Sequence, residues 1–66
     1  MKKSFGITVK DKREGENITQ TELAKAIGKS PQLICDIEAG RKKPGRETLV
    51  AIAKKLNISL DDIFLN

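Results

Sequence analysis

The sequence has no histidine, tryptophan or tyrosine, and Cys35 is its only cysteine. A structural zinc site needs four ligands, mostly cysteine and histidine, so a zinc finger is excluded. One cysteine also excludes an internal disulfide. The chain shows no activated-nucleophile motif and no glycine loop that could hold phosphate. We therefore identify no catalytic residue and expect no metal, cofactor or small-molecule ligand.

Aromatic side chains and long apolar runs are also scarce. Two phenylalanines are the only aromatic residues, which argues against a single-strand binder that stacks bases on aromatic rings. No apolar run is long enough to span a membrane, so we expect no membrane partner. The basic N-terminus, MKKSFGITVK, lacks the apolar segment of a signal peptide. A cytoplasmic location is the simplest expectation.

The chain nevertheless has the composition of a globular protein. Its 66 residues predict one domain over 1–66, and a hydrophobic content of 38% is enough for one core. The net charge of +4 is compatible with a nucleic-acid partner. Four cations lie close together in the sequence: Arg41, Lys42, Lys43 and Arg46.

Turn and capping residues divide the sequence into short helical segments. Thr19 and Glu22 form a capping box, and Ser30 precedes Pro31 as expected at a helix start. Apolar residues recur at helical spacing from Leu49 to Leu56. The sequence therefore predicts an all-α bundle of five helices, covering about 4–14, 19–28, 30–40 and 46–57, and a short last helix from Ser59.

The second and third predicted helices are joined by a very short turn, Gly28–Ser30. A turn of this length makes two helices cross steeply, with Ala24 where they approach and Gly28 where a positive φ is needed. Helical geometry places Gln32, Cys35 and Asp36 opposite the buried Ile34–Ile37 side. These three side chains should face outward.

The stretch TQTELAKAIGKSPQLICDIEAGRKKP resembles the helix-turn-helix of the xenobiotic-response-element family, which includes lambda-type phage repressors and Cro. The resemblance extends to Arg13 and through TLVAIAKKLNISLDDIF. The matching positions are Thr19, Gln20, Glu22, Leu23, Ala24, Gly28, Ser30, Ile34, Ile37, Glu38, Gly40 and Pro44. It implies a compact five-helix, lambda-repressor-like domain whose third helix enters the major groove of double-stranded DNA.

Gln32 is the best candidate for reading a base, because its amide can bond N6 and N7 of adenine. Asp36 has two open interpretations: it accepts a bond from cytosine, or it pairs with a nearby lysine or arginine. Leu33 and Pro31 either contact a thymine methyl or serve packing, and for Pro31 we favour the structural role. Cys35 is either a redox switch on the DNA-facing side or a small neutral side chain near DNA, and we favour the second, since the sequence shows neither a partner that would lower its pKa nor a resolving cysteine.

The resemblance also implies roles for residues outside this helix. Gln20 resembles the family's phosphate-binding glutamine at a helix start. Arg13 and Glu38 match family positions that form a buried ion pair, which is structural. The complete set of expected DNA contacts is Gln20, Ser30, Pro31, Gln32, Leu33, Cys35, Asp36, Arg41, Lys42, Lys43 and Arg46, the four cations contacting phosphate.

The predicted function is sequence-specific DNA binding by a transcriptional regulator, most simply a repressor that occludes a promoter. One recognition helix reads few base pairs, so we expect a homodimer on a palindromic operator. Its interface is expected at Leu60, Ile63, Phe64 and Leu65. A monomer that pairs only on DNA is the alternative state, and an antitoxin-like or bridging protein-interaction module is the alternative function.

Overall fold

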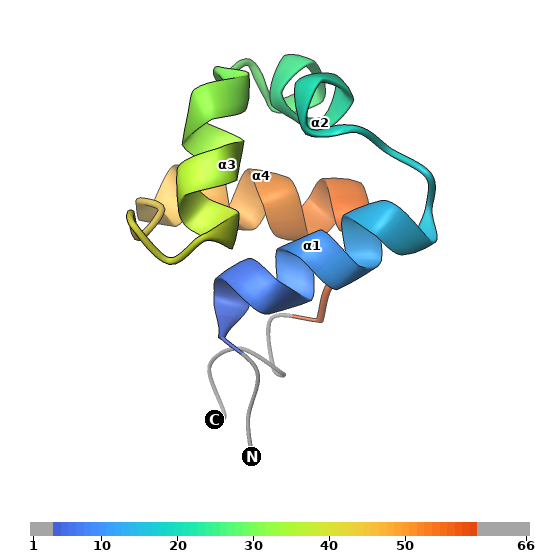
Figure 1. Cartoon of the computed structure of the whole chain (residues 1–66), viewed down its shortest axis with the longest axis horizontal. Coiled ribbons are helices and arrows are strands. Elements are labelled where there is room, and N and C mark those ends of the chain that lie inside the picture. The colour runs from blue at the N-terminus through green and yellow to red at the C-terminus, as the bar shows by residue number, and fades with distance from the viewer. Residues whose placement is uncertain (1–3, 60–66) are drawn as a thin grey trace.

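The structure, a computed structural model, describes residues 4–59. These residues form four α-helices and no strand, as Figure 1 shows: α1 (Phe5–Gly15), α2 (Gln20–Ile27), α3 (Pro31–Glu38) and α4 (Arg46–Leu56). The prediction of an all-helical fold is confirmed. The fifth helix that we expected from Ser59 onward lies outside the described residues, as do Leu60, Ile63, Phe64 and Leu65.

Helix starts and ends follow the local signals in the sequence. The Thr19 hydroxyl accepts a bond from the backbone N–H of Glu22, and the Glu22 carboxylate accepts one from the backbone N–H of Thr19. The Ser30 hydroxyl accepts from the N–H of Leu33 at 3.2 Å. α2 ends at Gly28, whose φ of 71° is the left-handed conformation expected there. These local bonds fix the boundaries of α2 and α3.

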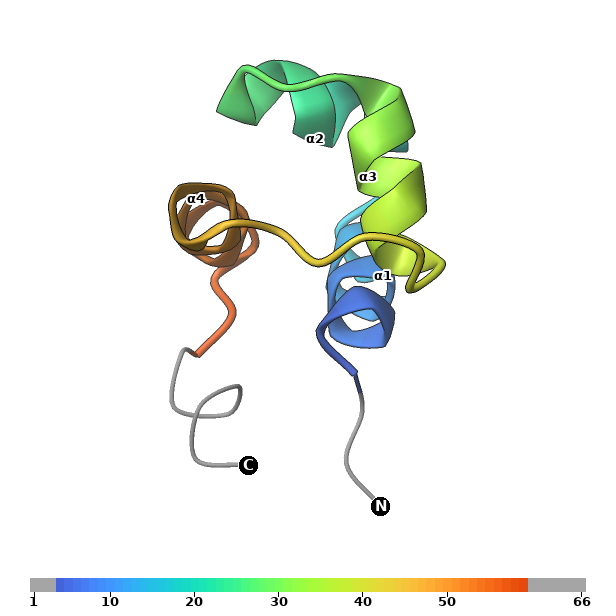
Figure 2. The ribbon, with the colours of Figure 1, turned by 90° about the vertical axis from the view of Figure 1, so that its left-hand side faces the viewer.

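The four helices enclose one apolar core. Val9, Leu23, Ile34, Ile52 and Leu56 are its largest fully buried side chains. α2 packs on α3 and α4, and α1 packs on the same two helices from the opposite end of the bundle (Figure 2). The inward side predicted for the third helix, at Ile34 and Ile37, is confirmed.

Small residues on α1 and α2 allow these helices to pack closely against α3. Ala24, only 1% exposed, lies in the core on α2, the helix that packs on α3. On α1, Gly6 approaches the last turn of α3 so closely that an added methyl group would clash with the backbone carbonyl of Ile37. The outer side of α3 is left at the surface of the bundle (Figure 1). Within residues 4–59, no helix is both long and apolar enough to cross a bilayer.

Candidate nucleic-acid interface

The outward side of α3 carries the side chains that helical geometry predicted. Gln32 is exposed and Cys35 and Asp36 are partly exposed, whereas Ile34 and Ile37 are buried. Leu33 is half-buried and packs against the core, which agrees with its packing interpretation. Pro31 is exposed at the first helical position, where its missing N–H costs no hydrogen bond.

Asp36 is the centre of a hydrogen-bonded cluster on this side of α3. Its Oδ1 accepts a bond from Gln32 Nε2 at 3.0 Å and another from Arg41 Nε at 2.9 Å. Arg41 also donates through Nη2 to Cys35 Sγ at 3.4 Å. The bonds from Arg41 and Gln32 hold the pKa of Asp36 below its ordinary value, so the carboxylate is ionised at neutral pH. Of the two interpretations of Asp36, pairing with arginine is present.

This cluster gives two of the expected DNA contacts a partner within the protein. Arg41, which was expected to contact phosphate, donates from its guanidinium to Asp36 and Cys35, and the contact with Asp36 raises its pKa. Gln32 was expected to be available to a base with its whole amide, but one N–H is already donated to Asp36. The i, i+4 spacing of Gln32 and Asp36 was a signal for their contact that the sequence interpretation missed.

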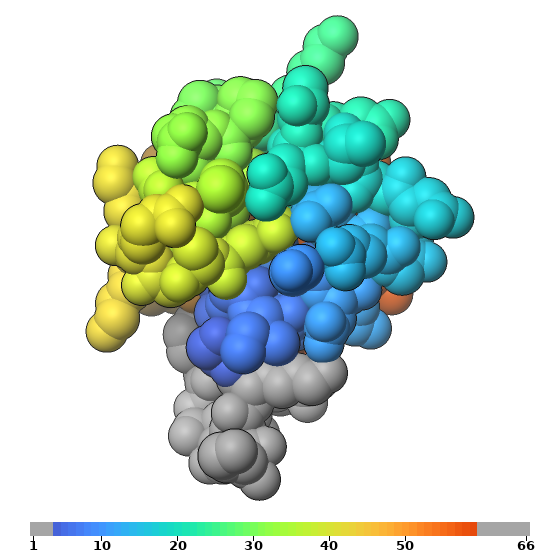
Figure 3. Space-filling view, viewed as in Figure 1, coloured from blue at the N-terminus to red at the C-terminus, as the bar shows by residue number. Residues whose placement is uncertain are grey.

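The basic segment lies beside the C-terminal end of α3. Residues 41–43 belong to the loop that follows α3, and Arg46 begins α4. Lys42, Lys43 and Arg46 are all exposed. Figure 3 shows this loop, in yellow, directly beside α3 on the same face of the molecule. The arrangement places positive charge along one border of the α3 surface.

A second polar cluster lies between α1, α2 and the end of α3. Arg13 donates through Nε to Glu38 Oε2 at 2.7 Å and through Nη2 to Oε1 at 3.0 Å. The side chains of Arg13 and Glu38 are 9% and 5% exposed, so this is the shielded ion pair that the family resemblance implied. Arg13 also donates to the carbonyl of Ile18 at 2.8 Å, and its bond to Glu38 raises its pKa.

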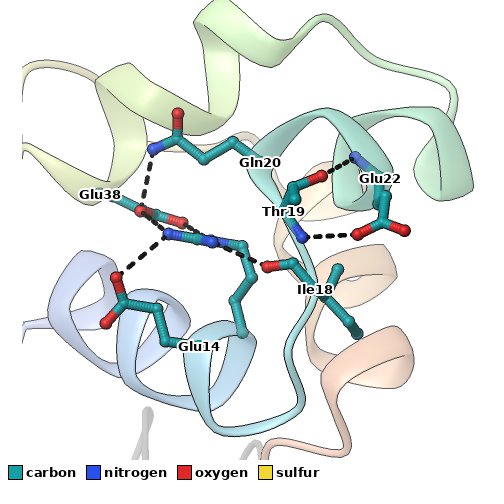
Figure 4. Close-up of polar contacts among 7 residues, drawn as sticks. Glu14, Ile18, Thr19, Gln20, Glu22 and Glu38 are labelled. Atoms are coloured by element: carbon teal, nitrogen blue, oxygen red, sulfur yellow. Dashed lines mark hydrogen bonds and ion pairs between the residues drawn. The ribbon is translucent and has the colours of Figure 1, made fainter.

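Gln20 belongs to the same cluster. Its Nε2 donates to Glu38 Oε1 at 3.1 Å, and Figure 4 shows the amide of Gln20 pointing across to Glu38 from the first residue of α2. The resemblance suggested that Gln20 binds phosphate and did not suggest this contact. Nothing in the local sequence indicated it, because the two residues are brought together only by the packing of α2 on α3.

The sequence of the chain is similar to those of helix-turn-helix proteins. A family model described as helix-turn-helix matches residues 9–63. The chain is 44% identical over 59 residues to the ImmF control region 10 kDa protein of Bacillus phage phi105, covering 89% of this chain and 66% of that protein. It is 33% identical over 57 residues to multiprotein-bridging factor 1 of Candida albicans, covering 86% of this chain and 38% of that protein.

A solved structure extends the similarity to the fold. The P22 c2 repressor protein, solved in complex with the synthetic operator 9T, superposes with a TM-score of 0.86 at 28% identity. The match covers 97% of this chain and 98% of that one. By contrast, the chain spans about two thirds of the length of the phage phi105 protein and well under half of the bridging factor.

Proposed function

Because the chain belongs to the helix-turn-helix family of DNA-binding transcription regulators, we propose that it binds double-stranded DNA by placing α3 in the major groove. The observation that carries this proposal is the position of α3. Its apolar side is buried in the core, while its exposed side presents polar side chains that can bond base edges. A major groove about 12 Å wide accepts one α-helix.

Phosphate contacts come from the borders of this surface. Lys42, Lys43 and Arg46 are exposed beside the end of α3 and are placed to meet the DNA backbone. Gln20 lies at the start of α2, where backbone N–H groups also favour an anion. Its amide carries two N–H groups, so the bond to Glu38 leaves one for a phosphate.

In vitro selection from a random duplex library, followed by fluorescence anisotropy with the selected sequence, tests the proposal. The unaltered chain should enrich a defined sequence and bind it more tightly than random duplex. Gln32→Ala should lose roughly 1–3 kcal/mol of discrimination at one or two base pairs and keep its nonspecific binding. Failure of the unaltered chain to bind any duplex at low salt would refute the proposal.

We further propose that the chain acts as a homodimer in the cytoplasm, and represses transcription by covering a promoter. One helix reads too few base pairs to find one site in a genome, whereas a two-fold pair reads two half-sites about 34 Å apart. Leu60, Ile63, Phe64 and Leu65 are the proposed contact residues. Sedimentation at micromolar concentration should show a dimer that Leu65→Glu dissociates. Binding of DNA by one chain at a time would contradict the dimer.

A protein-interaction module is the second candidate function. The similarity to multiprotein-bridging factor 1 favours it, although the chain covers only 38% of that protein. The selection experiment separates the two functions. An interaction module would enrich no sequence from the random duplex library.

A further inference from the structure

We propose that Asp36 sets the base preference of Gln32, making it selective for adenine over guanine, by holding one of its two amide hydrogens. This inference rests on the proposed function of α3 in DNA binding. Asp36 is a positioning residue in this role, since it acts on a base through Gln32 and needs no contact with the base itself.

The first step is the orientation of the Gln32 amide. An ionised carboxylate only accepts hydrogen bonds, so Asp36 can be faced by the NH₂ end of the amide but not by its oxygen. The 3.0 Å bond from Nε2 to Oδ1 has this orientation. Arg41 Nε, 2.9 Å from the same oxygen, secures the carboxylate in place. The Gln32 oxygen is thereby turned away from Asp36.

The second step is a count of what remains for a base. A glutamine amide has two N–H donors and one oxygen acceptor. With one N–H held by Asp36, Gln32 offers one donor and one acceptor. Adenine presents an acceptor at N7 and a donor at N6, and it matches this pair. Guanine presents two acceptors, N7 and O6, and it would need both N–H groups.

Guanine can therefore be bonded at both positions only if Gln32 gives up its bond to Asp36. A hydrogen bond to a charged acceptor is worth about tenfold or more in an equilibrium constant. Removing the carboxylate releases the second N–H, so the preference for adenine over guanine should fall by about tenfold at the base pair that Gln32 contacts.

Asp36→Ala, Gln32→Ala and the double variant test this inference with three duplexes: the selected site and two that carry guanine or another base at the Gln32 position. In the unaltered chain the site should carry adenine there. Asp36→Ala should lower the adenine-to-guanine affinity ratio about tenfold. When Gln32 is already alanine, Asp36→Ala should not change the adenine-to-guanine affinity ratio. If the effect persists in that background, Arg41, released from Asp36, reads the guanine and the inference is wrong.

Two controls isolate the cause. Glu16→Ala removes one exposed carboxylate from the turn after α1, so it should reproduce any general gain in affinity from lost negative charge but no change in the ratio. In the free protein, the side-chain amide signals of Gln32 in nuclear magnetic resonance spectra should move with Asp36→Ala and stay with Glu16→Ala. Unmoved amide signals, or an unchanged ratio with normal binding, would overturn this inference alone. Absence of DNA binding by the unaltered chain would overturn the proposed function as well.

Discussion

Replacing Glu38 with alanine removes the counter-charge of a buried guanidinium. Arg13 has a 9% exposed side chain and three of its nitrogens donate bonds, two of them to Glu38. After the replacement, the guanidinium remains charged, because arginine does not lose its proton in proteins. Only the bond to the carbonyl of Ile18 survives, and Gln20 also loses its acceptor. The variant therefore leaves the buried guanidinium with only the exposed Glu14, 3.8 Å away, as a counter-charge, and leaves the amide of Gln20 without its acceptor.

The expected loss of stability is large for a chain of this size. Breaking a buried ion pair by removing one partner costs about 3–5 kcal/mol, mainly because the remaining charge is uncompensated. A domain gains roughly 0.05–0.15 kcal/mol per residue, which gives about 3–10 kcal/mol for these 66 residues. Glu38→Ala should thus remove much of the free energy of unfolding, and Arg13→Met should be similarly harmful.

Urea denaturation followed by far-ultraviolet circular dichroism measures the effect. Glu14→Ala is the matched control, since Glu14 lies 3.8 Å from Arg13 Nη2 but is 57% exposed, and exposed pairs are worth ~0–1 kcal/mol. The double variant Arg13→Met/Glu38→Leu should be more stable than either single variant, because no buried charge remains. If Glu38→Ala unfolds without urea, the double variant still decides the question. A double variant as unstable as both singles, or a Glu38→Ala loss no larger than that of Glu14→Ala, would refute the reasoning.

Three further predictions concern packing, acid and salt. Gly6→Ala should destabilise the fold by roughly 1–3 kcal/mol in urea, because its methyl group would meet the backbone carbonyl of Ile37. The bonds from Thr19 and from Arg41 and Gln32 hold the pKa values of Glu22 and Asp36, respectively, below those of ordinary carboxyl groups, so their contribution to stability is present above the ordinary pKa and is lost as the pH falls through the lowered one. The urea concentration at the midpoint of unfolding should therefore fall as the pH is lowered. It should fall less for Glu22→Gln, which lacks the titrating carboxylate. Lys43→Ala should weaken binding to all duplexes and reduce the salt slope by about one unit, whereas an unchanged slope would mean that Lys43 meets no phosphate.

The helices were largely predictable because their boundaries depend on neighbouring residues. The capping box of Thr19 and Glu22, the Ser30 cap and the left-handed Gly28 each involve partners within one helical turn. The buried faces were predictable for a similar reason, since apolar spacing along one helix identifies its inward side. The fifth predicted helix stays a prediction, because residues from 60 onward lie outside the described part of the chain.

The polar contacts of the candidate site were less predictable. The path of the loop after Gly40 brings Arg41 back to Asp36, and α2 must pack on α3 before Gln20 reaches Glu38. Neither geometry is encoded by a local spacing. The ion pair of Glu38 with Arg13 was anticipated from the family resemblance, and periodicity alone would have suggested only that both residues lie near a buried face.

The two polar clusters have different roles on α3: one holds the helix in place and the other orients its exposed side chains. Glu38, on the last turn, bonds residues of α1 and α2 and therefore fixes where the helix lies. Asp36 bonds Gln32 on its own helix and Arg41 on the following loop, and therefore fixes what the exposed surface offers. Within residues 4–59, no side-chain hydrogen bond joins a residue of one cluster to a residue of the other. Variants of Asp36 should consequently alter base preference with a smaller loss of stability than variants of Glu38, which should weaken binding to every sequence in proportion to the unfolded fraction. Gln20 can couple DNA binding to the stability of the fold. If its amide donates to Glu38 and to a phosphate at the same time, DNA binding would stabilise the contact between α2 and α3.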